Sequence, residues 1–218
     1  MKSPNIPQNS VFAVAGMVGV GKSTMAHAIA ERLGFQESLE NVAENPYLER
    51  FYDDFERWSF HLQIFFLAER FKEQKHIFEN GGGFVQDRSI YEDVGIFAKM
   101  HADEGTMEAV DFETYMNLYE AMVLTPYFPH PNALIYLEGP LPVILDRIEM
   151  RGRNMELQTP RSYWEEMYRR YEQWIESFTA CPVIRLNIEE YDLLGNEADI
   201  ELVIEKIARK MKKTTPRV

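Results

Sequence analysis

The sequence predicts one α/β domain built on a doubly wound, five-stranded parallel sheet flanked by helices. Five short apolar runs alternate with segments of helical periodicity, the order that a parallel sheet with crossover helices requires. A glycine-rich loop joins the first apolar run to the first helical segment. The chain has 218 residues, 45% of them hydrophobic, so it can bury one core of its own. We expect residues 1–218 to form a single domain, with residues 1–9 as a loose leader.

The first strand is expected at Val11–Ala15 and the first helix at residues 25–33. Between them the loop carries Gly16, Gly19 and Gly21. Glycines let the backbone fold around an anion so that successive N–H groups point at it, and the following helix N-terminus adds partial positive charge. A flexible glycine turn that matched by chance would have no reason to lie between a strand and a helix. We therefore interpret the loop as a phosphate-binding loop.

Three polar residues follow these glycines and complete the predicted nucleotide site. Lys22 is placed to meet the β- and γ-phosphates, and Ser23 offers a hydroxyl to Mg²⁺. Thr24 is assigned to the same nucleotide site. The loop thus predicts a nucleotide bound together with Mg²⁺.

Turn residues and periodicity place the other elements. Gly34 stops the first helix, Pro46 suits the first turn of a short helix, and the glycines at 81–83 end the longest helix. Strands are expected at residues 35–39, 84–86, 133–137 and 183–186. Further helices are expected at residues 46–52, 57–79, 89–101, 108–124, 140–150, 162–178 and 200–211. An apolar stripe on the helix 108–124 indicates core packing or a dimer contact.

Two strand ends supply residues suited to phosphoryl transfer, which needs mainly positioning and cancellation of charge. Asp87 and Arg88 follow one strand and Glu40 follows another, at the edge where open α/β sheets bind ligands. Asp87 is expected to hold Mg²⁺. Arg88 can reach the acceptor oxygen and the moving phosphoryl group, and Glu40 can take the proton of an acceptor hydroxyl. The alternatives are an ordinary ion pair for the first two and a solvated acid for Glu40.

A second cluster consists of Arg147, Arg151 and Arg153, in the mobile-looking segment of about residues 147–160 that we expect to act as a lid. The first two share a helix face, and a glycine lets the segment bend before the third. Three arginines repel one another unless an anion lies among them. A lid closing over phosphates would supply that anion and exclude water. The alternative is a basic helix face compensated by Glu149 and Glu156.

Composition excludes several function classes. Asp and Glu number 35 against 23 Lys and Arg, and a net charge of −12 repels nucleic-acid phosphate. No apolar run approaches the roughly 20 residues of a membrane span. Cys181 is the single cysteine and cannot form an internal disulfide, and no charged-then-apolar leader precedes the first strand. We expect a cytoplasmic protein with no nucleic-acid or membrane partner.

Together these motifs resemble the deoxynucleoside kinase family, and most of all its members from bacilli that act on deoxyadenosine and deoxycytidine. The resemblance rests on the phosphate loop, residues 58–63, residues 87–89 and the arginine lid, and it extends from residue 6 to about residue 192. It implies a P-loop kinase fold, ATP with Mg²⁺ and transfer of the γ-phosphoryl group to a deoxyribose 5'-hydroxyl. It also implies a homodimer.

The resemblance assigns roles to further residues. Glu40 matches the general base, although the family often has Glu-Pro-Val where this chain has Glu-Asn-Val, and Glu44 is a competing carboxylate. Gln63 matches the residue that hydrogen-bonds the nucleobase. Its amide offers one donor and one acceptor, which fits adenine and cytosine equally.

The resemblance also places residues around the base. Arg70 and Asp93 match a charged pair found beside the base in members that accept purines or cytosine. Phe97 matches an aromatic residue that stacks on the base, and Trp58 one that lines the pocket. Core packing is the alternative for both aromatic residues.

Two more sites follow from the resemblance. Tyr52 and Glu156 match the pair that holds the sugar 3'-hydroxyl. The donor adenine is expected near Arg151 and the loop around Tyr191 and Asp192.

Three other functions compete with a deoxyadenosine and deoxycytidine kinase. A deoxyguanosine kinase of the same family could use the same charged pair. A nucleoside monophosphate kinase would need extra basic residues for an acceptor phosphate, whereas the predicted pocket suits a neutral nucleoside. A nucleotide-binding switch without enzyme activity would have no use for a base pocket with Gln63 and Phe97.

Overall fold

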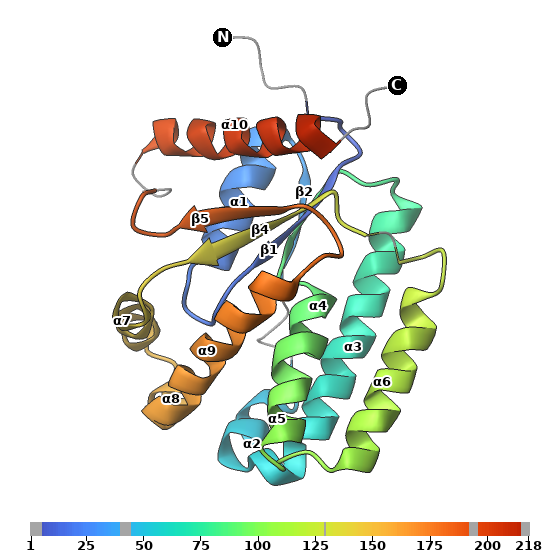
Figure 1. Cartoon of the computed structure of the whole chain (residues 1–218), viewed down its shortest axis with the longest axis vertical. Helices are drawn as coiled ribbons and strands as arrows, with labels where there is room; N and C mark the ends of the chain where they lie inside the picture. Colours follow the sequence, from blue (N-terminus) through green and yellow to red (C-terminus); the bar gives the residue numbers. More distant parts are fainter. Residues whose placement is uncertain (1–5, 40–44, 129, 192–195, 215–218) are drawn as a thin grey trace.

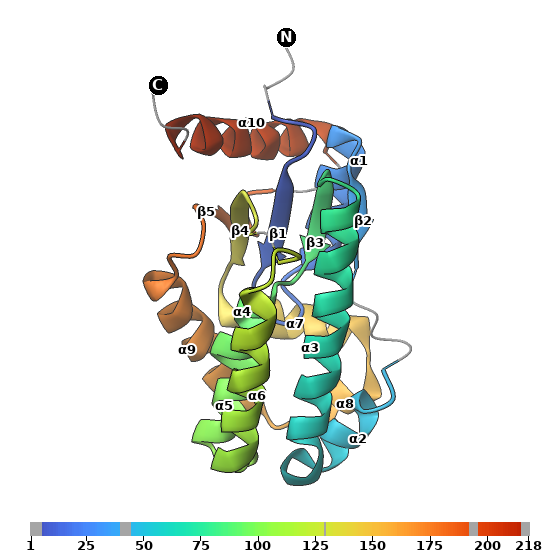
Figure 2. The same ribbon diagram turned by 90° about the vertical axis from the view of Figure 1, so that its right-hand side faces the viewer.

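A computed structural model describes residues 6–39, 45–128, 130–191 and 196–214. It confirms the predicted fold class: five parallel strands form one sheet in the spatial order β2-β3-β1-β4-β5 (Figures 1 and 2). The strands are β1 (Val11–Ala15), β2 (Gln36–Ser38), β3 (Phe84–Asp87), β4 (Ala133–Glu138) and β5 (Val183–Asn187). The central strands are buried along nearly their whole length, which explains their continuous apolar sequence.

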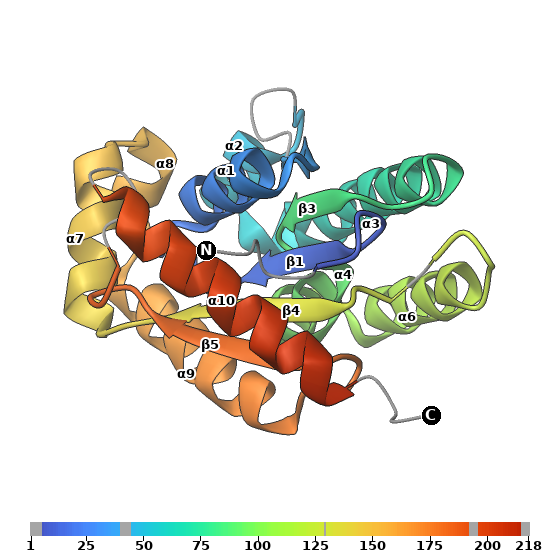
Figure 3. The same cartoon turned by 90° about the horizontal axis from the view of Figure 1, so that it is seen from above.

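Helices cover both faces of this sheet. They are α1 (Lys22–Leu33), α2 (Leu48–Asp53), α3 (Phe55–Glu79), α4 (Ile90–Glu92), η1 (Asp93–Ala98), α5 (Lys99–Asp103), α6 (Ala109–Val123), α7 (Leu141–Arg151), α8 (Asn154–Leu157), α9 (Arg161–Ser177) and α10 (Glu197–Thr214). The helices α1 and α10 lie on one face and contact each other, while α9 and the run from α4 to α5 lie on the other (Figure 3). None of the helices described here is long and apolar enough to span a bilayer.

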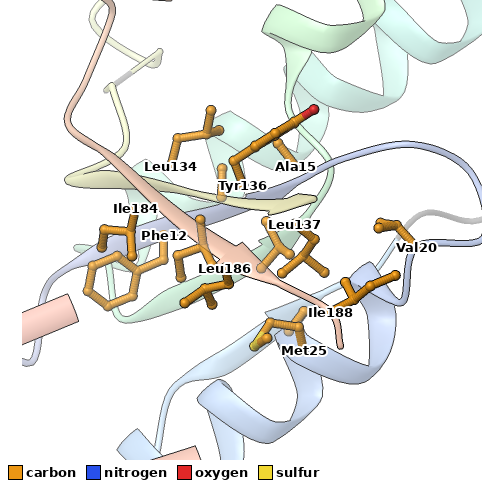
Figure 4. Packing of buried hydrophobic residues seen from close by; sticks show 14 of the residues in the cluster. Phe12, Ala15, Val20, Met25, Leu134, Tyr136, Leu137, Ile184, Leu186 and Ile188 are labelled. Atoms are coloured by element: carbon orange, nitrogen blue, oxygen red, sulfur yellow. The ribbon is translucent and has the colours of Figure 1, made fainter. Parts of the chain in front are cut away.

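The main core lies between the sheet and its two helical layers. Figure 4 shows side chains of β1, β4 and β5 on the α1 side of the sheet, with Phe12 and Leu186 fully buried near Met25 of α1, while Leu134 and Tyr136 point to the other side of the sheet. Burial of each large apolar side chain contributes about 1.5 to 3 kcal/mol. This packing fixes the carboxyl end of β1, from which the phosphate loop emerges.

A second, smaller core joins α3 and α6, which lie side by side in Figure 2. Tyr115 of α6 is fully buried in it, so the apolar stripe predicted on this helix is partly core. Other apolar residues of the same helix are exposed: Val110 is 61% and Leu118 is 40% exposed. The predicted dimer contact stays a prediction.

The predicted helix 89–101 is not one regular α-helix, because residues 93–98 form the π-helix η1. Gly95 lies in this turn, where an added Cβ would come within 2.7 Å of the indole nitrogen of Trp174 on α9. Close packing of α9 at the glycine accompanies the wider turn. Such turns are frequent at functional sites.

Candidate active site

The phosphate loop runs from β1 to α1, and its three predicted glycines all have positive φ. At Gly16 φ is 142°, and an added Cβ would lie 2.6 Å from the carbonyl oxygen of Leu137. Lys22 folds back over the loop, and its Nζ donates hydrogen bonds to the carbonyls of Gly16 and Met17 at 2.8 and 3.1 Å. The lysine is thereby held at the mouth of the loop, where phosphates would lie.

A cavity of about 520 Å³ opens beside this loop. The structure brings most of the predicted site residues together in its wall: Gly19, Gly21, Lys22, Ser23, Thr24, Tyr52, Gln63, Asp87, Arg88, Asp93, Phe97, Arg147, Arg151, Arg153 and Glu156. The apolar residues of the wall include Phe51, Leu62, Phe66 and Tyr163. Apolar walls with a few convergent polar groups are typical of small-molecule sites.

Asp87 and Ser23 meet at the phosphate end of the cavity. The hydroxyl of Ser23 donates to Oδ2 of Asp87 at 2.5 Å. Asp87 is buried at the end of β3, and its other carboxylate oxygen has no hydrogen-bond partner among the described residues. A hydroxyl and a buried carboxylate placed together in this way are oxygen ligands that suit Mg²⁺.

Arg88 is the one described residue other than glycine with a positive φ, of 77°. Its backbone N–H donates to the carbonyl of Val14 at 2.9 Å, which ties the turn after β3 to β1. The guanidinium lies 4.6 Å from the ring centroid of Phe97 and donates to the hydroxyl of Tyr171 at 3.0 Å. The strained backbone therefore directs a buried cation into the cavity.

The far end of the cavity carries the residues predicted to read the base. Gln63 of α3 is 1% exposed, and its side-chain oxygen has no hydrogen-bond partner among the described residues. Arg70 lies two turns further along α3. It donates hydrogen bonds from Nε to Asp93 at 3.0 Å and from a terminal nitrogen to Glu73 at 3.2 Å. Both members of the predicted pair are buried, with Asp93 in the cavity wall and Arg70 behind it.

The arginine lid has features of both interpretations given above. The lid segment, residues 147–160, contains the short helix α8, and Glu156 on that helix is 3% exposed. Its carboxylate accepts hydrogen bonds from Arg151 at 2.6 Å and from Arg153 at 3.4 Å. Arg147 donates to the carbonyl of Val20 in the phosphate loop at 2.9 Å. Two lid arginines are thus compensated by a glutamate, which was the alternative interpretation, although all three face the cavity.

Trp58 does not line the cavity, contrary to the prediction. It packs against Tyr47, with a ring distance of 5.9 Å, and lies beside the guanidinium groups of Arg50 and Arg57. The physical reason is local packing: Trp58 lies one turn before Leu62 and nearer the start of α3, where Tyr47 and two arginines contact its ring.

A second cavity of about 350 Å³ lies on the other side of the phosphate loop. It is bounded by Tyr191 and by Asn187 at the end of β5, and it shares Arg147 with the first cavity. This is the region where the donor base was expected. Asp192, named with it, lies outside the described residues.

The predicted general base Glu40 and its competitor Glu44 also fall outside the described residues. The strand β2 that precedes them ends at Ser38, beside β3, as the prediction required. Their roles stay predictions.

The family model described as deoxynucleoside kinase matches residues 12–212. This chain belongs to the deoxynucleoside kinase family.

Two curated relatives match this deoxynucleoside kinase over most of both chains. The deoxyadenosine/deoxycytidine kinase of Bacillus subtilis (strain 168) is 70% identical over 208 residues, covering 95% of this chain and 96% of the relative. The deoxyguanosine kinase of the same organism is 35% identical, covering 88% and 93% of the two chains.

Solved structures agree with the fold. The deoxyadenosine kinase of M. mycoides with the products dCMP and a flexible dCDP has a TM-score of 0.79 and 32% identity, covering 91% of this chain and 99% of that one. The same enzyme with bound dATP has a TM-score of 0.77 and 32% identity, covering 91% and 98%.

Several residues of this deoxynucleoside kinase site were missed by the sequence analysis. Glu73 is the second carboxylate on Arg70, and its spacing of three residues on a helix was a usable signal. Glu92 and Tyr171 form a buried network behind Arg88. Their separation of 79 residues in the sequence gives no local signal.

Proposed function

We propose that this deoxynucleoside kinase transfers the γ-phosphoryl group of ATP to the 5'-hydroxyl of deoxyadenosine and deoxycytidine. The observation that carries the proposal is that one cavity has the phosphate loop at one end and the buried amide of Gln63 at the other. The 70% identical relative supports the choice of bases.

Base recognition is proposed to use the unpaired oxygen and the NH₂ group of Gln63. A side-chain amide can accept from and donate to adenine N6 and N7, or the amino group and ring nitrogen of cytosine. The buried ion pair of Arg70 and Asp93 supplies fixed charge beside the base. Phe97, in the cavity wall, offers a ring face against which the base can stack.

For phosphoryl transfer the chain supplies positive charge around the reacting group. Lys22, Arg88 and the lid arginines line the cavity from different sides, which suits the charge spread over phosphate oxygens. Glu40 is proposed to accept the proton of the 5'-hydroxyl. Tyr52 and Glu156 are proposed to hold the 3'-hydroxyl.

Ser23 and Asp87 would hold Mg²⁺. One carboxylate oxygen of Asp87 has no hydrogen-bond partner among the described residues, so it is available to a cation. The ion would neutralise negative charge on the phosphates. The second cavity is proposed to receive the donor base near Tyr191. Because ATP is the proposed donor, the proposed place of action is the cytoplasm.

We also propose that the chain acts as one domain within a homodimer. Exposed apolar residues on and after α6 support a contact there: Val110, Leu118 and Leu124 are 61%, 40% and 84% exposed. Large exposed apolar groups gathered on one element are typical of an interface. Sedimentation equilibrium checks the subunit number.

The function is tested by measuring ATP-dependent phosphorylation of the four common deoxynucleosides. Deoxyadenosine and deoxycytidine are expected to have the highest kcat/KM. Thymidine as the best acceptor would contradict the roles given to Arg70 and Asp93. ATP turnover that ignores every added nucleoside would instead indicate a nucleotide-binding switch.

Deoxyguanosine kinase is the second candidate, because a 35% identical relative carries that name. The same assay separates the two functions, since deoxyguanosine would then be the best acceptor. The proposed function expects deoxyguanosine to be a poorer substrate.

A further inference from the structure

Glu92 is a fully buried carboxylate that the mechanism above does not use. It lies at the end of α4, behind the cavity wall. Burying a charge without partners is costly, so a buried carboxylate is retained where several donors satisfy it. Here four donors meet it, and they come from three parts of the chain.

One oxygen of Glu92 has a local, structural role. Oε2 accepts from the backbone N–H of Ser89 at 2.9 Å and from its hydroxyl at 3.2 Å. Together with the first turn of α4 this forms a capping box, a common device that satisfies a helix N-terminus. Capping explains this oxygen and leaves the other one unexplained.

The other oxygen reaches the phosphate loop and α9. Oε1 accepts from the backbone N–H of Gly16 at 3.0 Å and from the hydroxyl of Tyr171 at 3.0 Å. The Tyr171 hydroxyl in turn accepts from the guanidinium of Arg88 at 3.0 Å. On the loop side, the carbonyl of Gly16 accepts from Nζ of Lys22 at 2.8 Å.

These contacts form one continuous chain of hydrogen bonds across the reaction site. It runs from Arg88 through Tyr171, Glu92 and Gly16 to Lys22. Its two ends are the cations proposed to contact the acceptor side and the donor phosphates. Glu92 is 0% and Tyr171 is 1% exposed, so water does not compete for these hydrogen bonds.

We propose that Glu92 and Tyr171 are positioning residues, which fix the phosphate loop and the guanidinium of Arg88 relative to each other for phosphoryl transfer. The proposal rests on the role of Arg88 in the proposed function. Neither residue faces the cavity, so each acts through the groups that it holds. The need is physical: small misplacement of reacting groups lowers turnover far more than it lowers binding.

Two variants remove the links while keeping local structure. Tyr171→Phe keeps the ring and deletes the hydroxyl between Arg88 and Glu92. Glu92→Gln can keep its amide oxygen on the Ser89 cap, while its NH₂ group cannot accept from Gly16 or Tyr171. Tyr168→Phe is the matched control, because Tyr168 lies one turn earlier on α9 and its hydroxyl donates to the carbonyl of Gly139 at 3.2 Å, outside the cavity.

The measurement is kcat and KM for ATP and for the deoxynucleoside, together with the thermal midpoint of each variant. Tyr171→Phe and Glu92→Gln are expected to lower kcat about tenfold or more, with both KM values changed less than about threefold. The double variant should lose little more than the worse single variant, since both act through one chain of bonds. Tyr168→Phe should keep the kcat of the wild type.

The proposal is overturned if Tyr171→Phe keeps kcat within about twofold of the wild type, or if Tyr168→Phe loses as much. A lower thermal midpoint with unchanged kcat would show a purely structural role and overturn it as well. Wild-type turnover tests the proposed function, whereas the ratio of variant to wild-type turnover tests the positioning role. If a different nucleoside proves to be the best acceptor, the ratio is measured with that nucleoside. The proposed function and the positioning role can therefore fail independently of each other.

Discussion

The side-chain amide of Gln63 is the contact on which the proposed choice of bases depends. Its oxygen is buried and without a partner among the described residues, so a bound base would supply the missing hydrogen bond. Replacing Gln63 by Leu should weaken deoxynucleoside binding by about 1 to 3 kcal/mol, because the polar edge of the base is then buried unpaired. Isothermal titration with deoxyadenosine measures this change.

A glutamine on the same helix gives the control for this prediction. Gln74 lies about three turns further along α3, is 4% exposed, and donates to Gln86 at 3.1 Å. Gln74→Leu should lower thermal stability without changing nucleoside affinity, since Gln74 does not line the cavity. Equal losses of affinity in both variants would contradict the role of Gln63.

His101 predicts how stability depends on pH. Its ring is fully buried against Phe51 and Tyr163, two residues of the cavity wall. Burial, assisted by the charge of Arg170, lowers the pKa of His101 to about 4. The unfolded chain therefore binds a proton between pH 6.5 and about 4 that the folded chain excludes, so stability falls as the pH drops through this window.

Removing His101 should flatten this dependence. Between about pH 7.5 and about pH 5, His101→Asn is expected to lose about 2 kcal/mol less unfolding free energy than the wild type. Urea denaturation at the two pH values measures the difference. The absolute stability of the variant is lower at both, which does not affect the comparison of slopes. Parallel pH dependence in the two proteins would mean that His101 takes up its proton equally readily in the folded and unfolded states.

Whether the sequence could locate a site residue depended on how far away along the chain the partners of that residue lie. Lys22 and Asp87 were found because each belongs to a short motif at a strand end. Glu92 and Tyr171 were not found, because their contact exists only once α9 has packed against η1. Trp58 was misplaced, since sequence spacing gives the position on a helix and not the direction of the cavity.

At the scale of the element, two of the glycines in the strand, loop and helix at the start of the chain differ in how much room an added side chain would have. Gly16 has φ 142° and no room for a Cβ, whereas Gly34, at the end of α1, has φ 68° and nothing within 4 Å of an added Cβ. Gly16→Ala should abolish ATP binding, because the Leu137 backbone cannot yield. Gly34→Ala should cost only about 1 kcal/mol of stability.

Activity and thermal unfolding of these two variants check the prediction. Gly34→Ala should keep wild-type kcat, since its conformational cost lies away from the cavity. Measurable ATP binding by Gly16→Ala would show that the loop can rearrange around the added methyl group.

The elements themselves were predictable where local pattern and environment agree. The strands β1, β3 and β4 are short apolar runs, and burial on both faces demands such runs. The π-helix η1 could not be foreseen, because its apolar spacing resembles that of an α-helix and its wider turn accompanies Trp174 packing on Gly95. The helix α8 was missed because four residues are too few for periodicity.

At the scale of the whole molecule, the two cavities meet at the phosphate loop. Both are bounded by Gly19, Gly21, Thr24 and Arg147, so one loop separates the proposed acceptor and donor sites. The acceptor cavity reaches without interruption from Gln63 to Lys22. A ligand that carries both a nucleobase and a triphosphate can therefore occupy the acceptor site and the phosphate loop together.

This geometry predicts that dATP and dCTP inhibit the enzyme as bisubstrate ligands. With the base at Gln63 and the triphosphate on the loop, either compound should compete with the deoxynucleoside and also with ATP, and the lid arginines would offset its added charge. Initial-rate kinetics with each substrate varied in turn measure this, and dAMP serves as the control because it is too short to reach the γ-phosphate position. Inhibition by dATP that is competitive with ATP alone would mean that it binds as a donor, and the acceptor cavity would then not extend to the loop in solution.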